Sequence, residues 1–512
     1  MSEEHRAGAP GQSPPRPTGS RTRHRPGAVL AIVLTLQTML ILDVNVVNIA
    51  LPDLKEALGF TPTGLSWVLS SYLLAFGGLL LLGGRAGDVL GHRRGMVIGV
   101  TVFTAASLLG GLSTSAGMLL AARALQGVGA AFAAPTVLAL IATHFTDPAA
   151  RARALGLYAA VSGSGAAIGL IGGGLLTDWL SWRWVLFINV PVGIALLVAA
   201  PLFIRETERT PARFDLGGAL TSTVGTTALV HGFIRAADSG WTDPLTLLSF
   251  TLAVVLLALF VVVETRAAQP ITPLRLFADR NRATGYLVLL FVMAAGNAMF
   301  FFLTQFLQEV RDFTPIQAGL AFVPLAALIL AASAVAAKAL PRTGPRVLTA
   351  VGAAAISVAL IWFARITPDA DYVSALLAPM LIAGLGMGTL LVGVTTILMS
   401  GLAPQDSGAA SGLLNVMQQI GGALGLAFMV TVFGAASRSA RSELPAALTP
   451  RQAADQVLTE GVTTAFTWGA GFTALTILLT LVMRTTSAGG TENAASEPTP
   501  EPAPEPAAGR QG

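Results

Sequence analysis

The 512-residue chain contains no cysteine and little charge. Without cysteine it can form no disulfide, no thiolate metal site and no thiol nucleophile. Asp, Glu, Lys and Arg make up 11% of the residues, whereas a soluble domain has about 25%. Because 53% of the residues are hydrophobic, the composition predicts an integral membrane protein that crosses the bilayer many times.

Motifs for enzymatic chemistry are also missing. The sequence has no Gly-x-x-x-x-Gly-Lys-Ser/Thr loop for nucleotide phosphates and no suggestive Ser/His/Asp arrangement. The histidines are scattered between the chain ends and the edges of apolar runs, without the spacing of metal ligands. We therefore expect a protein that is not an enzyme and has no metal or cofactor. The five histidines are His5, His24, His92, His144 and His231.

Both ends of the chain differ in composition from the rest. Residues 1–26 are rich in Pro, Arg, Gly and Ser and lack the apolar core of a signal peptide. Residues 486–512 are rich in Pro, Glu and Ala. Such segments bury too little apolar surface to fold, so we predict a disordered basic N-terminal arm and a disordered C-terminal tail.

Fourteen apolar runs are long enough for a transmembrane helix, which needs about 20 mostly apolar residues. The links between them are mostly too short for a separate domain. The pattern predicts an all-α integral membrane protein. The runs lie near residues 27–50, 66–84, 95–113, 117–142, 153–176, 184–204, 216–235, 246–264, 284–307, 316–337, 347–365, 373–400, 408–435 and 461–483.

Basic residues indicate the orientation, because Lys and Arg concentrate in cytoplasmic segments. If the N-terminus is cytoplasmic, twenty basic residues fall in inside segments and eight in outside loops. This excess and the even number of runs predict that both termini are cytoplasmic. We expect a multi-pass protein of the plasma membrane, and the abundance of Ala, Gly and Arg suggests a bacterial one.

A weak internal repeat divides the chain. Gly91-His92-Arg93-Arg94, after the second run, resembles the basic, glycine-containing link at 338–346 after the tenth. We therefore predict a six-helix bundle at 27–204, two additional transmembrane helices with linkers at 205–283, and a second six-helix bundle at 284–485. Duplicated bundles are typical of secondary transporters.

Two ionisable residues, Asp43 and Arg123, lie within apolar runs, where charge is costly and usually functional. A carboxyl group in a partly dehydrated site is a candidate for loading and releasing protons, so we expect Asp43 to couple transport to protons. Arginine stays protonated, and Arg123 is expected to tune a nearby carboxylate. The alternative for both residues is a structural contact between helices.

Glycines mark one face of the run 153–176. Gly165, Gly169 and Gly173 recur at intervals of four, a spacing that lets two helix backbones approach closely. The stripe predicts a packing face, and its many glycines suggest a flexible or sliding contact.

Amide and aromatic side chains share helical faces in several runs. They could line a cavity for a partly polar, partly aromatic substrate, or they could bond to neighbouring helices. The candidate cavity residues are Gln37, Asn48, Asn297, Phe301, Gln305, Asn415 and Gln419.

The short link Gly84–Arg94 combines glycines with an acid and three arginines. With Gly84, Asp88, Gly91, Arg93 and Arg94, it resembles the signature between helices two and three of the major facilitator superfamily. Four further stretches resemble the fourteen-helix drug:proton antiporters of that superfamily. These stretches are Leu42–Pro52, Arg123–Gly129, Trp182–Gly193 and Asn415–Gly422.

The resemblance covers about residues 27–485 and implies two six-helix bundles plus two inserted helices around a central cavity. It implies export of hydrophobic or amphipathic small molecules, such as drugs or antibiotics, by alternating-access antiport with protons. A monomer in the lipid bilayer, without nucleic acid, is the form it implies. Gly84, Asp88, Gly91, Arg93 and Arg94 would form a conformational gate.

One departure concerns the coupling. The antiporter signature has proline after glycine in helix five, whereas here Leu170 follows Gly169 and Ala166 follows Gly165. A facilitator or a proton symporter that imports a small metabolite therefore stays an alternative. A membrane sensor or an intramembrane enzyme is the alternative from another class.

Overall fold

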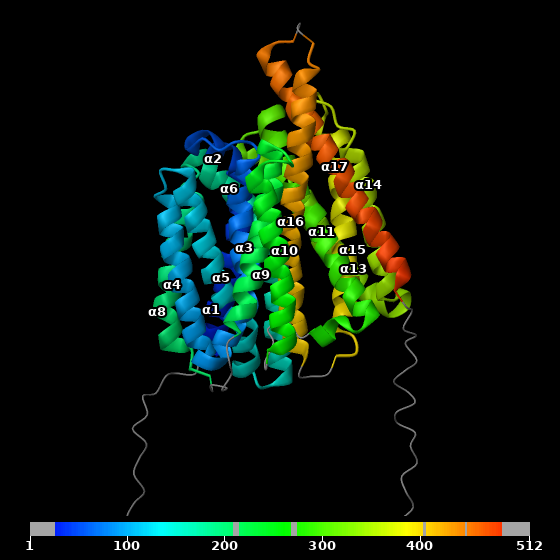
Figure 1. The fold of residues 1–512 in the computed structure, drawn as a ribbon. Coiled ribbons are helices and arrows are strands. Elements are labelled where there is room, and N and C mark those ends of the chain that lie inside the picture. Colours follow the sequence, from blue (N-terminus) through cyan, green and yellow to red (C-terminus); the bar gives the residue numbers. More distant parts are fainter. Residues whose placement is uncertain (1–25, 208–214, 268–273, 403–405, 446–447, 484–512) are drawn as a thin grey trace, which may run out of the picture.

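The computed structural model describes residues 26–207, 215–267, 274–402, 406–445 and 448–483. The predicted C-terminal tail and the N-terminal arm, apart from residue 26, lie outside this part of the chain. All regular elements within it are helical (Figure 1).

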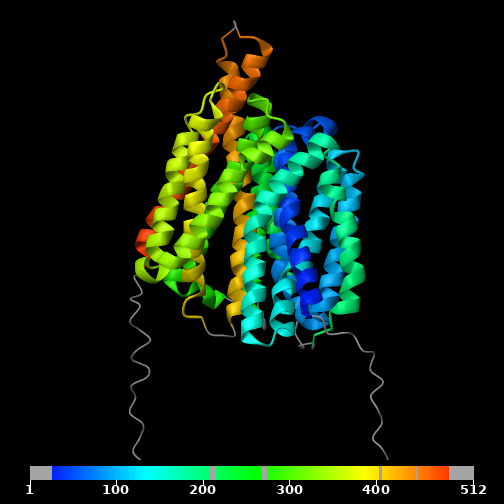
Figure 2. The ribbon, with the colours of Figure 1, turned by 180° about the vertical axis from the view of Figure 1, so that it is seen from behind.

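The first group of helices runs up and down along one side of the molecule (Figures 1 and 2). Its long helices are α1 (Pro26–Ile49), α3 (Trp67–Leu90), α4 (His92–Gly111), α5 (Ala116–His144), α6 (Pro148–Trp179) and α8 (Asn189–Phe203). Its short helices are α2 (Leu51–Leu58), η1 (Gly64–Ser66) and α7 (Trp184–Phe187). Within the group, α5 packs on α3 and α4, and α1 packs on α6.

A pair of helices and a second group complete the chain. The pair is α9 (Leu216–Ser239) and α10 (Pro244–Arg266), followed by η2 (Leu274–Phe277). The second group comprises α11 (Arg280–Gln305), η3 (Phe306–Val310), α12 (Pro315–Ala321), α13 (Val323–Thr343), α14 (Pro345–Phe363), η4 (Tyr372–Leu377), α15 (Ala378–Met399), α16 (Ser407–Ser442) and α17 (Pro450–Val482). The two groups meet where α3 packs on α16 and where α6 packs on α12 and α13.

Twelve helices of the described chain are long and apolar enough to span a membrane. Helices α6 and α9, at 32 and 24 residues, are long enough but are not among the twelve. Twelve of the fourteen expected spans are therefore found among the described residues. Helix α9 contains many Gly, Ser and Thr residues, which lower its hydropathy, and some side chains of α6 lie outside the part of the chain that the structure describes.

Sequence-encoded caps place the helix ends. Asp147 accepts a hydrogen bond from the backbone of Ala150, and Pro148 occupies the first turn of α6. Gly91 and Gly344 end α3 and α13 with φ angles of +98° and +77°, a region that favours glycine. These two glycines lie in the two basic links that the sequence analysis compared, so the links also share a backbone conformation.

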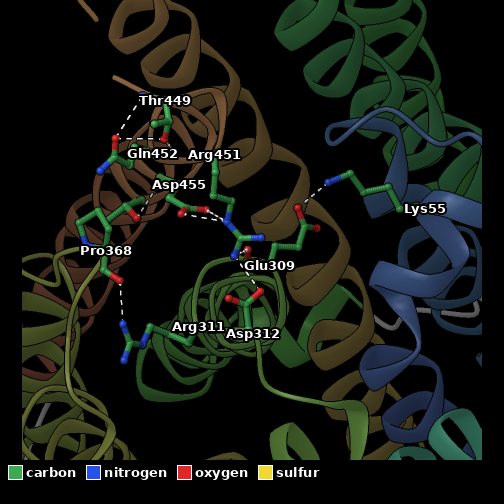
Figure 3. Close-up of polar contacts among 10 residues, drawn as sticks. Lys55, Glu309, Arg311, Asp312, Pro368, Thr449, Arg451, Gln452 and Asp455 are labelled. Carbon is green, nitrogen blue, oxygen red and sulfur yellow. Dashed lines mark hydrogen bonds and ion pairs between the residues drawn. The ribbon is translucent and has the colours of Figure 1, made fainter. Parts of the chain in front are cut away.

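The two groups touch at the end of the molecule where α1 ends, which we term the closed end. Lys55 of α2 pairs with Glu309 of η3 at 2.6 Å (Figure 3). Nearby, the Gln308 side chain donates to the backbone oxygen of Ile49 at 2.9 Å. A Cβ atom on Gly174 of α6 would lie 2.7 Å from the backbone oxygen of Pro315. Ion pairing, hydrogen bonding and close packing therefore all join the groups at this end.

Arg451 of α17 extends the polar contacts of the closed end within the second group. It pairs with Asp312 at 2.8 Å and donates to the backbone oxygen of Glu309 at 3.0 Å (Figure 3). Asp312 has a φ of 55°, which is costly for a residue with a side chain. The contact with Arg451 thus helps to hold the chain in an unfavourable turn directly after the π-helix η3.

Helices α14 and α15 cross at a pair of glycines. A Cβ atom on Gly352 would lie 2.6 Å from the backbone oxygen of Gly386, and the reciprocal distance is also 2.6 Å. Side chains at either position would force the helices apart. The crossing therefore depends on both glycines.

We predict that Gly386→Ala destabilises the protein, because overpacking in a tight interface costs about 1–3 kcal/mol. The thermal-unfolding midpoint of the purified protein in detergent measures the effect. Gly471→Ala is the matched control, since nothing lies within 4 Å of a Cβ atom built there. If the two variants had the same unfolding midpoint, the dependence of the helix crossing on Gly386 would be contradicted.

Candidate functional site: a buried ion pair beside a central cavity

A cavity of about 1840 Å³ lies between the two groups of helices. Its first wall comes from α1, α3, α5 and α6, and its second wall comes from α15 and α16. The cavity reaches the end where α1 begins and α17 ends, which we term the open end. There the lining side chains of Asp88 and Arg275 are 44% and 69% exposed.

The deeper walls combine amides, hydroxyls and aromatic rings. On the first wall, Gln37 donates to the hydroxyl of Ser162 at 3.2 Å, and Asn45 donates to its own helix at 2.8 Å. The second wall carries Asn415, Gln418 and Gln419 of α16. The aromatic lining residues are Tyr72, Phe76 and Tyr158. Such a surface can hold an amphipathic molecule by apolar contact and a few hydrogen bonds.

Asp43 and Arg123 form an ion pair in the first group, outside the cavity lining. The Arg123 guanidinium donates through Nη1 to the Asp43 carboxylate, and the residues are 0% and 1% exposed, respectively. Arg123 Nε also donates to the backbone oxygen of Val68 at 3.1 Å. Since a buried charge without a partner is very costly, each residue depends on the other.

Neutral donors complete the shell around the carboxylate. Gln126 and Asn189 donate to Asp43 Oδ1 at 2.9 and 2.8 Å. Gln126 also bonds to the hydroxyl of Ser107 at 2.7 Å, and its side-chain oxygen accepts from Arg123 at 3.0 Å. These side chains come from α1, α4, α5 and α8. The network therefore ties four helices together around one carboxylate.

Tyr72 of α3 separates the ion pair from the cavity. The Arg123 guanidinium lies 4.5 Å from the centre of the Tyr72 ring, and Tyr72 also lines the cavity. A guanidinium over an aromatic face is attracted by the negative charge of the ring face. One side chain thus contacts both the polar network and the space where a ligand fits.

The predicted gate residues lie at the open end. Gly84 and Asp88 line the cavity, and Asp88 lies 3.7 Å from His92. Arg93 and Arg94 lie 3.5 and 3.7 Å from Glu206, instead of pairing with Asp88. Glu206 also accepts from the backbone of Arg93 at 3.1 Å.

Gly91 is required where the gate link meets Glu206. Its φ is +98°, and a Cβ atom there would collide with the Glu206 side chain. Only glycine lets the carboxylate approach this backbone so closely. The link is therefore held by the segment that follows α8, within the first group.

The glycine stripe of α6 packs on α1. Cβ atoms on Gly165, Gly169 and Gly173 would lie 2.6 to 2.9 Å from atoms of Ile41, Asn45 and Val46. The stripe therefore gives the close helix contact that the spacing indicates, and this contact lies inside the first group. The contact between the groups uses the neighbouring Gly174.

The predicted cavity residues divide into two sets. Gln37, Asn415 and Gln419 line the cavity. Asn48, Asn297, Phe301 and Gln305 do not line it. Phe301 and Gln305 are buried near the closed end, where Phe301 packs edge-on against Phe302. Asn297 donates to its own helix at 3.1 Å and faces Gly422 of α16.

Several site residues were missed by the sequence analysis. Asn189, Gln126, Ser107 and Tyr72 are ordinary polar or aromatic residues whose partners are distant in the chain. Glu206 directly follows Arg205 after an apolar run, but it is one of several acids in this basic link and carried little signal of its own. Asn45, which lines the cavity beside Gln37, was not among the predicted cavity residues.

Comparisons with known proteins agree on one family. The sequence profile of the Major Facilitator Superfamily matches residues 33–426. The chain is 40% identical over 476 residues to the puromycin resistance protein pur8 of Streptomyces alboniger, covering 92% of this chain and 94% of that protein. It is 40% identical over 431 residues to the cephamycin export protein CmcT of Amycolatopsis lactamdurans, covering 83% and 89%.

Solved structures share the fold. A bacterial homolog of the human lysosomal transporter Spinster, in an inward-facing and occupied conformation, matches with a TM-score of 0.64 and 18% identity over 89% of this chain and 96% of that chain. The nucleoside transporter NupG matches with a TM-score of 0.62 and 13% identity over 90% and 100%.

We predict that Arg123→Gln lowers stability more than the double variant Asp43→Asn/Arg123→Gln. The single change leaves a buried carboxylate unpaired, which costs about 3–5 kcal/mol, whereas the double change removes both charges. Thermal unfolding of the purified variants gives the comparison. If the double variant were the less stable of the two, the pairing would not be the main reason for retaining both charges.

Proposed function

The chain belongs to the major facilitator superfamily, and from this premise we propose that it exports a hydrophobic or amphipathic small molecule in exchange for protons. It is a multi-pass transporter of the plasma membrane, with bacterial relatives. The names of those relatives, which concern puromycin, cephamycin and lincomycin, support an antibiotic as the exported molecule. The observation that carries the proposal is the buried Asp43–Arg123 pair beside a cavity that is open at one end.

The proposed topology has fourteen spans with both termini in the cytoplasm. Helices α6 and α9 join the twelve apolar helices, since each packs along helices of that set. The six-helix bundles then comprise residues 27–204 and 284–485, with the inserted pair between them. In this orientation the open end faces the cytoplasm, and the protein is inward-facing.

Asp43 is the proposed proton carrier. Protonation would neutralise the carboxylate and weaken its attraction to Arg123. Arg123 would keep its bonds to Gln126 and the Val68 backbone, so the released arginine retains partners in the same network. Loss and gain of one proton therefore switches the network between two arrangements, which alternating access requires.

The proposed substrate lies against the amide and aromatic walls of the cavity. Gln37, Asn415 and Gln419 would contact it in the inward-facing state. Asn48, Asn297, Phe301 and Gln305 lie outside that lining, and we propose that they contact substrate when the closed end opens. The carried molecule would thus lie between the two groups, whereas the proton would bind inside the first group, in a protein that acts as a monomer.

The link Gly84–Arg94 is the proposed cytoplasmic gate. Asp88 is half-exposed at the cavity mouth, where closure would bring it toward the second group. Glu206 would hold Arg93 and Arg94 so that the link moves as one body with the first group. The α6 glycines would allow α1 and α6 to slide as the cavity closes.

We predict that Asp43→Asn abolishes export driven by a pH gradient, because the amide cannot take up and release a proton. Puromycin accumulation in inverted membrane vesicles with an imposed pH gradient measures it, with protein content checked by immunoblot. Asp369→Asn, at an exposed acid outside the apolar helices, should transport normally. Full gradient-driven transport by Asp43→Asn would refute the proton role.

A second prediction concerns the gate. Asp88→Asn should slow the transport cycle while leaving substrate binding unchanged, because the carboxylate lies at the mouth and outside the deeper walls. Transport rate in vesicles and equilibrium binding to purified protein separate the two effects. Normal export by this variant would remove Asp88 from the gate.

A further inference from the structure

Tyr72 lies between the ion pair and the cavity, a position that no other described residue bonded to the ion pair shares. Asp43 and Arg123 contact Gln126, Asn189, Val68 and Tyr72 through hydrogen bonds or a ring contact. Of these side chains, Tyr72 alone also lines the cavity. Among these contacts, the ring of Tyr72 is therefore the one that a ligand in the cavity can touch.

The Tyr72 ring contacts the guanidinium of Arg123, whose hydrogen bonds use only two of its three nitrogens. Arg123 Nη2 is buried and has no hydrogen-bond partner, while Nη1 and Nε are bonded to Asp43, Gln126 and Val68. The ring face lies 4.5 Å from the guanidinium carbon. Its negative face stabilises the guanidinium in place against Asp43.

The Tyr72 hydroxyl is equally unusual, because it is buried and has no hydrogen-bond partner. A buried hydroxyl without a partner is costly, and a function often explains such a group. The Tyr72 ring instead packs against the Phe76 ring, whose centre lies 5.7 Å away. No residue of the described chain bonds its oxygen, so the ring can shift without breaking a hydrogen bond.

We propose that Tyr72 is the positioning residue through which substrate and proton compete. This rests on the proposed proton-coupled export. A substrate packed on the cavity side of the ring holds it against Arg123, which keeps Arg123 on the Asp43 carboxylate and disfavours protonation. Protonation of Asp43 releases Arg123, and the freed guanidinium moves the ring and changes the cavity wall.

The competition is reciprocal by thermodynamic linkage. If substrate disfavours the proton, the proton weakens substrate binding by the same factor. The charged or titratable side chains that face this point are Asp43 of α1, Arg123 of α5 and Tyr72 of α3, with Tyr158 of α6 on the cavity wall. The packed helices α4 and α8 contribute the neutral Ser107 and Asn189.

The test measures proton release when puromycin is added to purified, weakly buffered protein containing a pH indicator dye. In the unchanged protein we expect release, and puromycin affinity should weaken by up to about tenfold per pH unit as Asp43 is protonated. Tyr72→Leu should bind puromycin with an affinity that changes less than about twofold across the same range, with little proton release.

Two further variants separate positioning from folding. Tyr72→Phe keeps the ring and should keep proton release, which a merely destabilising change would not restore. Tyr72→Met fills similar space without an aromatic face and should lose release as Tyr72→Leu does. If Tyr72→Leu does not fold, the difference in proton release between Tyr72→Met and Tyr72→Phe tests the proposal.

Asn415→Ala is the matched control, since Asn415 lines the opposite wall on α16, bonds to its own helix and makes no recorded contact with Tyr72 or Arg123. It should change puromycin affinity but keep proton release. If Tyr72→Leu shows the same proton release and the same pH dependence of puromycin affinity as the unchanged protein, and Asp43→Asn is inactive, only the Tyr72 proposal is overturned. Release by Asp43→Asn, or none by the unchanged protein, would instead overturn the proposed function.

Discussion

The structure depends on one interaction, the ion pair between Asp43 and Arg123. Both side chains are almost completely buried, and a charge removed from water must be matched by its partner and by hydrogen bonds. Gln126, Asn189 and the Val68 backbone supply those bonds. The arrangement of α1, α3, α5 and α8 is constrained by this requirement, and the first wall of the cavity is built on three of these four helices and their neighbour α6.

The sequence predicted the parts of this arrangement that are local. A charge within an apolar run is conspicuous, so Asp43 and Arg123 could be selected, and Gln37 was selected as an amide on the face of an apolar run. The sequence could not predict which distant polar residues complete the network, because Gln126 and Asn189 meet Asp43 across 83 and 146 residues of chain. Helical spacing also does not indicate how far along a helix a cavity lies. The face of α11 that contains Phe301 and Gln305 was therefore predicted to line the cavity, whereas the cavity lies nearer the other end of the molecule. Helices α6 and α9 were counted as spans from length and pattern, yet the glycine and hydroxyl content of α9 keeps its hydropathy low.

The inserted pair is more than an addition to the edge. Helix α9 packs on both α3 and α16, the helices through which the two groups meet. The Thr431 hydroxyl of α16 donates to the backbone oxygen of Phe233 at 2.6 Å, and Thr63, just before η1, bonds to Asp238. Together with the Lys55–Glu309 pair, these contacts hold the closed end from several directions. When one group moves against the other, α9 must therefore either move together with one of them or exchange its hydrogen bonds.

The second wall of the cavity shares no hydrogen bond with the ion-pair network. Asn415, Gln418 and Gln419 all come from α16, whereas every recorded bond to Asp43 or Arg123 comes from the first group. Substitutions on this wall can alter the shape and polarity of the cavity while leaving the buried charges fully paired. The architecture thus offers a route by which related chains could diversify the molecules they accept in small steps, since the residues of this wall are separate from those whose loss is severe.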